Sequence, residues 1–159
     1  MRRVVSLRQL DLRQSDDFDC LRVHIGLLYA ELFGEGLVPS EACFDALAEQ
    51  IRDRGPAHWA FLGTAPDQKP IAFATLAESF AVFAEGAYGI INELWVHRDH
   101  RSRGVGARVL EHCRQFGLHR GWRRIDVSAP AMAKWDRTFA FYQNHGFELT
   151  GRKLKIRLK

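Results

Sequence analysis

A strand, a glycine-bearing turn and a helix are encoded in one stretch of this chain, Val96-His97-Arg98-Asp99-His100-Arg101-Ser102-Arg103-Gly104-Val105-Gly106-Ala107. An apolar run precedes this stretch and an amphipathic run follows it. Gly104 and Gly106 let the backbone come close to a ligand, and the helix after them begins with unpaired N–H groups at the positive end of its dipole. Together with the nearby arginines, those donors suit phosphate oxygens. A tight turn can also need glycine for its geometry alone, so the stretch by itself leaves both interpretations open.

Two well-known phosphate-binding motifs do not fit this stretch. The Walker-type loop ends in Gly-Lys-Ser/Thr, whereas Gly106 is followed here by Ala107 and Arg108. The dinucleotide fingerprint needs a third glycine where this chain has Val109. The sequence therefore predicts neither of these two kinds of nucleotide site.

The pattern Arg101-x-x-Gly104-x-Gly106 resembles instead the Arg/Gln-x-x-Gly-x-Gly/Ala motif of the GNAT superfamily of acetyl-CoA-dependent N-acetyltransferases. Residues 141–147, Phe-Tyr-Gln-Asn-His-Gly-Phe, are similar to the family's Phe-Tyr-x-x-x-Gly-Phe signature. Residues 92–96, Asn-Glu-Leu-Trp-Val, stand where the family has its acidic central strand. The three motifs follow one another in the family's order and at its spacings, so the chain as a whole resembles this family.

The resemblance implies that acetyl-CoA is the co-substrate and that its acetyl group passes directly to an amine of a small molecule in a ternary complex. It also implies that the co-substrate's pyrophosphate is held by the loop residues Arg101, Ser102, Arg103, Gly104, Val105, Gly106 and Ala107. Backbone groups of Leu94, Trp95 and Val96 would pair with the amide-bearing arm of the co-substrate. The chain departs from many relatives at Trp135 and Thr138, where they carry Asn and Ala, so the resemblance does not transfer the contact made by that Asn to this chain.

Transfer of an acetyl group to an amine requires two proton transfers, and the resemblance assigns them to Tyr142 and Glu93. A lysine-like amine has a pKa of about 10.4 and must lose a proton before it attacks, which a carboxylate such as Glu93 can accept. The departing thiolate needs a proton, which a tyrosine hydroxyl can donate. Tyr142 is therefore the expected acid, and a packed core tyrosine on the last helix is the alternative.

Glu93 interrupts an apolar strand, where a carboxylate without a partner or a purpose is costly. In some polyamine-acetylating relatives the acid falls one position earlier, where this chain has Asn92. Because neighbouring residues of a strand face opposite sides, Glu93 points to the wrong side unless a bulge redirects it. A structural carboxylate paired with an arginine is the alternative. The other candidate bases are Glu31, Glu35, Glu78 and Glu85.

Hydrophobic periodicity predicts a mixed α/β fold, with a sheet flanked by helices in the order β-α-α-β-β-β-α-β-α-β-β. The GNAT family uses the same order, and the resemblance implies that the sheet is largely antiparallel. Helices are expected at 15–33, 40–54, 105–118 and 132–144. Strands are expected at 4–12, 59–62, 71–83, 88–96 and 124–127, and on both sides of 150–152. Ser15 is expected to cap the first helix, and Phe44, Leu47 and Ile51 to form the buried face of the second.

Length and composition predict a single domain over residues 1–159. No apolar run approaches the roughly 18 residues that span a bilayer, and the N-terminus lacks the apolar core of a secretory signal. Cys20, Cys43 and Cys113 are odd in number and widely spaced, which favours buried thiols in a reducing cytosol over disulfides or metal ligands. A cytoplasmic location without a membrane partner is therefore expected.

A formal net charge of +4 fits either a nucleic-acid partner or a basic pocket for a polyphosphate. Much of the excess lies in residues 152–159, where Leu154, Ile156 and Leu158 alternate with cations as in a strand with one dry face. No recognition helix or motif of stacking aromatics accompanies this segment, so no nucleic-acid partner is expected. The sequence leaves open whether the chain forms a homodimer.

In the fold that this chain resembles, the segment between the first two helices borders the acceptor groove. Phe33 and Leu37 would give that groove an apolar floor, and Glu31 and Glu35 would attract a cation. This favours small cationic amines such as polyamines or aminoglycosides, and small primary amines in general are the expected acceptors. The chain's own positive charge opposes polycations at long range. His97 and His100 lack the spacing of a metal site, so no metal is expected. A protein or peptide N-acetyltransferase and a non-catalytic acyl-CoA-binding module of the same fold are the alternatives.

Overall fold

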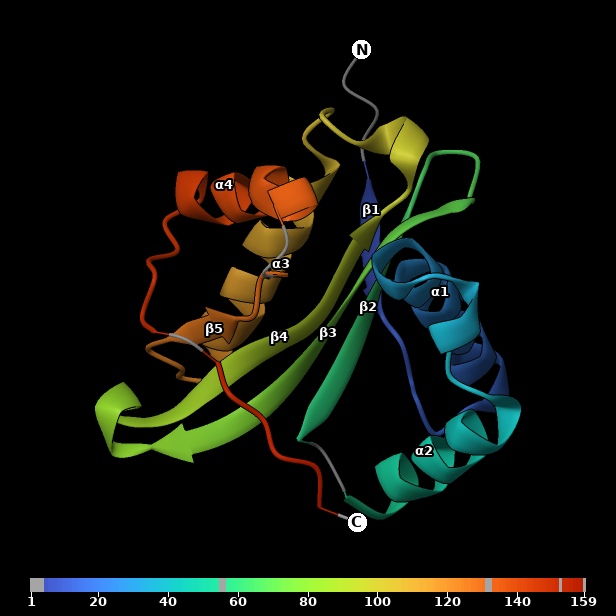
Figure 1. The fold of residues 1–159 in the computed structure, drawn as a ribbon, viewed down its shortest axis with the longest axis horizontal. Helices are drawn as coiled ribbons and strands as arrows, with labels where there is room; N and C mark the ends of the chain where they lie inside the picture. Colours follow the sequence, from blue (N-terminus) through green and yellow to red (C-terminus); the bar gives the residue numbers. More distant parts are fainter. Residues whose placement is uncertain (1–4, 55–56, 131–132, 152, 159) are drawn as a thin grey trace.

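The computed structural model describes residues 5–54, 57–130, 133–151 and 153–158. Over these residues the chain forms five strands and four α-helices (Figure 1). Their order and bounds are β1 (Ser6–Gln9), α1 (Ser15–Phe33), α2 (Glu41–Arg54), β2 (His58–Thr64), β3 (Pro70–Ala81), β4 (Gly86–Val96), α3 (Val105–His119), β5 (Ile125–Val127) and α4 (Asp136–Asn144). The α/β order predicted from the sequence is confirmed from β1 to α4. None of the described helices is long and apolar enough to cross a membrane.

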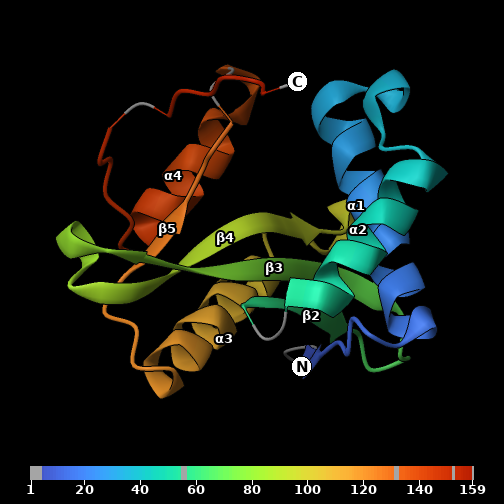
Figure 2. The same ribbon diagram turned by 90° about the horizontal axis from the view of Figure 1, so that it is seen from below.

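The strands form one sheet in the order β1-β2-β3-β4-β5. The first four strands are antiparallel to their neighbours, and β5 runs parallel to β4. A parallel pair needs a crossover connection, which α3 supplies between β4 and β5. Figure 2 shows α1 and α2 on one side of the sheet and α3 on the other, with α4 near the end that carries β5.

Alternating side chains of the strands build one core on each face of the sheet. The core on the α3 side includes the almost fully buried residues Phe61, Leu76, Ile91, Val109 and Cys113. The core on the α1 side includes Leu21, Leu62, Phe73 and Trp95. Burial of one large apolar side chain contributes about 1.5–3 kcal/mol, so these two cores hold the sheet between its helices.

A bulge at Asn92 sets the direction of the second half of β4. Glu93 pairs with Thr75 of β3, whereas Leu76 pairs with Ile91, so Asn92 is an extra residue on β4. Ile91 consequently belongs to the α3-side core, although Trp95 belongs to the α1-side core. A regular strand would place residues 91, 93 and 95 on one face. The bulge therefore turns the side chain of Glu93, the candidate base, toward α1. A bulge is the condition under which the strand pattern allows Glu93 to face the site.

The two strands predicted around residues 150–152 are not formed by the part of this segment that the structure describes. Residues 147–151 and 153–158 have no regular secondary structure, and Arg152 lies outside the described residues. The predicted dry face is also wrong, because Leu154, Ile156 and Leu158 are 84–90% exposed. Alternation produces a strand only where a neighbouring backbone completes its hydrogen bonds, and the described edge strand β5 is just three residues long.

Several smaller expectations are corrected as well. Ser15 is the first residue of α1 and not its cap, because Gln14 occupies the N-cap position. Leu47 is 38% exposed because it lines a cavity instead of packing into a core. Cys43 is exposed and not buried. The last helix begins at Asp136, after a 3-10 turn (Ala133–Trp135), and its predicted start at Met132 lies outside the described residues.

Candidate active site

The glycine turn predicted between β4 and α3 is present. A 3-10 turn (Arg98–His100) leads into it from β4, and α3 begins at Val105. Ser102 and Gly104 have φ angles of 60° and 79°, which glycine adopts readily and most other residues avoid. Gly104 is the N-cap of α3, and among the described residues no side chain caps this helix end. The first N–H groups of α3 are therefore available to an anion.

Two arginines hold the glycine turn in place. Arg101 donates from Nε to the carbonyl oxygen of Val96 at 2.8 Å and from Nη2 to Glu31 of α1 at 2.6 Å. Its guanidinium therefore ties the turn to the end of β4 and to α1. Arg137, in the first turn of α4, donates to the hydroxyl of Ser102. Sequence reasoning missed Arg137, because its contact with Ser102 depends on how α4 packs beside the turn.

The edge of β4 that faces β5 is paired over three residues only. Gly89, Ile90 and Ile91 pair with residues 125–127, and β4 then continues to Val96 past the end of β5. Within the described chain, Leu94, Trp95 and Val96 have no strand partner on this side. An unpaired strand edge can hold an extended ligand through backbone hydrogen bonds. This edge runs from the bulge toward the glycine turn.

Glu93 is held in place by Thr75 of β3. The Thr75 hydroxyl donates to the carboxylate of Glu93 and accepts from the backbone N–H of Glu93 at 3.2 Å. Burial raises the pKa of Glu93, and the hydrogen bond from Thr75 offsets part of the rise. Among the described residues no arginine or lysine forms an ion pair with this carboxylate, so the predicted alternative of an arginine pair does not apply to them. A carboxyl group with a raised pKa is suited to accepting a proton near neutral pH.

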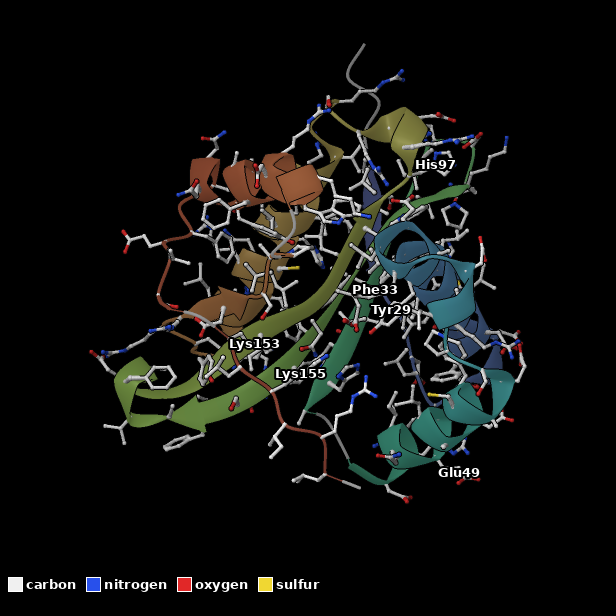
Figure 3. The ribbon with its side chains drawn as sticks, viewed as in Figure 1. Tyr29, Phe33, Glu49, His97, Lys153 and Lys155 are labelled. Atoms are coloured by element: carbon white, nitrogen blue, oxygen red, sulfur yellow. The ribbon has the colours of Figure 1, made fainter. Side chains whose placement is uncertain are left out.

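A cavity of about 380 Å³ opens between α1, α2 and the strands β3 and β4, and Glu93 and Asn92 both line it. Burial, and to a smaller extent the charge of Glu93, raises the pKa of Tyr29 of α1. The rings of Tyr29 and Phe33 meet edge to face with centroids 5.4 Å apart. Figure 3 shows these two side chains next to each other, between α1 and the middle of the sheet.

Phe33 and Glu35, the predicted acceptor residues, lie outside the walls of this cavity. Phe33 is 53% exposed at the end of α1, and Glu35 is exposed in the 3-10 turn (Glu35–Leu37) that follows. The Tyr29 ring contacts that of Phe33, and the charge of Glu93 raises the pKa of Tyr29, so Tyr29 is the residue of α1 that these observations relate to both. Sequence reasoning missed Tyr29, since one tyrosine on an amphipathic helix forms no motif.

Tyr142 lies on α4 and is 7% exposed. Its ring packs against Phe141 and Phe147, each at a centroid distance of 5.4 Å, and it shares the α3-side core with Cys113. Burial raises the pKa of Tyr142 to about 12, so the hydroxyl keeps its proton at neutral pH. Tyr142 and Glu93 thus lie on opposite faces of the sheet, on the α3 side and the α1 side.

Most of the other candidate bases have structural partners. Glu31 accepts from the indole of Trp95 at 3.2 Å in addition to Arg101. Glu78 accepts from the indole of Trp122 at 2.6 Å, and Glu85 forms an ion pair with an arginine. Glu93 is the candidate that combines a raised pKa with a place in the cavity wall.

His97 and His100 lie edge to face with ring centroids 5.8 Å apart, beside a second hollow of about 490 Å³ at the β2–β3 turn. In Figure 3, His97 is well separated from Tyr29 and Phe33. Within the part of the chain that the structure describes, no group of three or more His, Cys, Asp or Glu residues could hold a metal ion.

The model of the acetyltransferase (GNAT) family matches residues 27–147 of this chain. The match begins inside α1 and extends through α4, so it includes the bulge, the glycine turn and Tyr142. A search among curated proteins gives no match.

Several solved structures have the same fold. An aminoglycoside acetyltransferase from an uncultured soil metagenomic sample is 18% identical with a TM-score of 0.75, over 98% of this chain and 99% of that chain. An aminoglycoside N-acetyltransferase in complex with CoA is 19% identical with a TM-score of 0.73, over 99% and 96%. A ribosomal-protein-alanine N-acetyltransferase from Brucella melitensis biovar Abortus 2308 is 18% identical with a TM-score of 0.69, over 98% and 99%. At these identities the likeness shows the fold alone.

Proposed function

Since this chain belongs to the GNAT acetyltransferase family, we propose that it transfers the acetyl group of acetyl-CoA to the primary amine of a small molecule by direct attack in a ternary complex. The observation that carries this proposal is the unpaired edge of β4, which begins beside Glu93 and leads to the uncapped start of α3. The backbone of this stretch offers hydrogen-bond donors and acceptors to an extended co-substrate. The Glu93 side chain, at one end of the stretch, offers a carboxylate to the amine.

The residues of the turn and of β4 fit the co-substrate. The backbone N–H groups of Val105, Gly106 and Ala107 bind the pyrophosphate at the positive end of α3. Ser102 and Arg103 flank them, and residues 94–96 pair with the amide-bearing arm. Arg101 contributes by fixing the turn, since its guanidinium already bonds Glu31 and the end of β4.

Glu93 and Tyr142 carry the proton transfers. Deprotonating a lysine-like amine at pH 7.4 costs about three pKa units, or about 4 kcal/mol, and Glu93 accepts this proton directly or through a water molecule. Bound acetyl-CoA supplies the acetyl group as a thioester. As the amine nitrogen bonds to the acetyl carbon and the carbon–sulfur bond breaks, the hydroxyl of Tyr142 donates its proton to the sulfur. The nitrogen, once bonded to the acetyl carbon, releases its second proton, which returns through water to the Tyr142 phenolate, so the products are an N-acetyl amide and the free thiol.

A thiol-release assay with purified protein, acetyl-CoA and a panel of amines tests the proposal. We expect thiol release that depends on a small primary amine, with the acetylated amine detected by mass spectrometry in equal amount. Thiol release with N-terminal or lysine peptides alone would instead favour the protein or peptide acetyltransferase. Binding of acetyl-CoA without release of thiol with any amine would identify a non-catalytic acyl-CoA-binding module.

Gly104→Asp is expected to weaken acetyl-CoA binding by about a hundredfold, because it places a negative charge where the pyrophosphate would lie. Gly104→Asn is the matched control, since Asn has nearly the same size, tolerates the φ of 79° and carries no charge. We expect it to weaken binding by less than about tenfold. Calorimetric titration with acetyl-CoA measures both. Equal losses in the two variants would show that backbone strain, and not charge, dominates, and would argue against a pyrophosphate at this turn.

A further inference from the structure

The cavity beside Glu93 is mostly apolar. It is lined from the two helices on the α1 side by Phe18, Leu21, Ile25, Phe44, Leu47 and Ile51. Its volume of about 380 Å³ falls in the range of cavities that enclose small molecules. A ligand that fills it therefore gains mainly by burying apolar surface.

One carboxylate in the wall of this cavity is left without a cationic partner. Glu78 also lines the cavity, but its carboxylate already accepts from Arg120 at 3.0 Å and from Trp122 at 2.6 Å. Glu93 has only the hydroxyl of Thr75 as a side-chain partner within the described residues. The cavity therefore has the charge to balance one ammonium group and no more.

The remaining ionisable groups of the cavity wall do not favour a second positive charge. Arg22 lines the cavity and pairs with Asp19 at 3.3 Å and with Glu41, so those two carboxylates are engaged. His58 offers no negative charge, and burial lowers its pKa so that it stays neutral at neutral pH. A second ammonium group in this cavity would lose its water without gaining a carboxylate, which is costly.

We infer, on the basis of the proposed transfer to an amine, that the acceptor is a monoamine with an apolar body and not a polycation. Its amine lies at Glu93, and its apolar body lies among the side chains that α1 and α2 contribute to the cavity. The net charge of +4 acts in the same direction, because it repels polycations more strongly than monocations. A monoamine belongs to the small primary amines that the sequence predicts, whereas the polyamines and aminoglycosides given there as examples carry several positive charges.

Hexylamine and the diamine of the same chain length form a matched pair of probes for this inference. Binding to the CoA-saturated protein is measured by calorimetry, and turnover is measured by thiol release. We expect the diamine to bind at least about tenfold more weakly, because its second ammonium has no partner. Along the series from propylamine to hexylamine, affinity should rise by roughly fourfold for each methylene that enters the cavity. Equal or tighter binding of the diamine, or of an aminoglycoside, would overturn the inference.

Leu47→Glu tests where the apolar body lies, because Leu47 lines the cavity and is exposed enough to accept a charge without disrupting a core. The variant should weaken hexylamine binding by about tenfold and should reduce or reverse its advantage over the diamine. Leu27→Glu is the control, since Leu27 is an exposed apolar residue of α1 outside the cavity wall. We expect it to leave both affinities unchanged. Equal effects of the two variants, or no effect of Leu47→Glu, would show that the amine binds elsewhere.

Calorimetry and turnover together separate this inference from the proposed function. Preferred acetylation of polycations would refute the apolar acceptor while the acetyltransferase proposal stands. Binding of hexylamine in the cavity without thiol release from any amine would refute catalysis while the binding preference stands.

Discussion

Tyr142→Phe is expected to lower kcat by about a hundredfold to ten-thousandfold, the usual contribution of a general acid, while acetyl-CoA binding changes little. The substitution removes one oxygen and keeps the ring, so the contacts with Phe141 and Phe147 remain. The pKa of Tyr142 is raised to about 12, so its hydroxyl is protonated over the whole working pH range. Rapid-quench measurement of a single turnover reports the chemical step, and calorimetry reports acetyl-CoA binding.

Tyr88→Phe is the matched control, because Tyr88 on β4 is also a largely buried tyrosine, 8% exposed, and the substitution likewise removes only its hydroxyl. It packs against Phe83 at the other end of the strand, and we expect its kcat to stay within about twofold of the parent. If Tyr142→Phe also keeps the parent's kcat, Tyr142 is a core residue and the proton reaches the sulfur from another source.

The fold from β1 to α4 could be predicted because its signals are local. Apolar residues at helical spacing define α1 and α3, and Gly104 and Gly106 mark the connection between β4 and α3. The chain after Gly146 could not be predicted in the same way. The alternation of Leu154, Ile156 and Leu158 is a strand pattern, but forming a strand depends on a partner edge that sequence periodicity does not reveal.

Residues of the candidate site that belong to a sequence motif could be predicted. Contacts that depend on how distant elements pack against one another could not. The glycine turn stands in a motif, so its position between β4 and α3 follows from the sequence, whereas for Glu93 the motif gives only the place along β4. The hydrogen bond from Thr75 and the proximity of Tyr29 depend on the register of β3 against β4 and on the position of α1. The bulge at Asn92 is decisive for Glu93, and its position cannot be read from a run of mixed apolar and polar residues.

Arg101 illustrates how structure can change the role of a motif residue. The motif alone associates its charge with a phosphate, but its guanidinium bonds Glu31 and the end of β4. The same carboxylate accepts from Trp95, so α1, β4 and the glycine turn share one set of hydrogen bonds. In the acetyl-CoA complex that we propose, the positive charge for the pyrophosphate therefore comes mainly from the backbone at the start of α3 and from neighbouring residues such as Arg103.

Glu93→Gln is expected to lower kcat/KM at neutral pH by about a hundredfold to ten-thousandfold, because the amide cannot accept the proton of the amine. Burial raises the pKa of Glu93 above the ordinary value of 4.5. Only the carboxylate is active as a base, so the parent's activity should fall as pH decreases through this raised pKa. The pH profile of kcat/KM should show this acid limb in the parent and lack it in the variant. Thr75→Val should shift the limb to higher pH, because the Thr75 hydrogen bond lowers the pKa of Glu93.

The effect of the same substitution on stability separates a catalytic from a structural carboxylate. Because the pKa of Glu93 is higher in the folded than in the unfolded chain, its favourable contribution is complete below the unfolded pKa and is lost as pH rises through the folded pKa. Glu93→Gln should therefore unfold at an equal or higher temperature than the parent at pH 8, and the difference should shrink toward pH 4.

Glu78→Gln should show the opposite change and unfold at a lower temperature than the parent at neutral pH. Hydrogen bonds from Arg120 and Trp122 hold the pKa of Glu78 below its usual value, so its contribution to stability is present at neutral pH and lost in acid. Thermal unfolding at several pH values measures both variants. A Glu93→Gln variant that is destabilised at pH 8 and keeps the parent's acid limb would mean that Glu93 is structural and that another group accepts the proton.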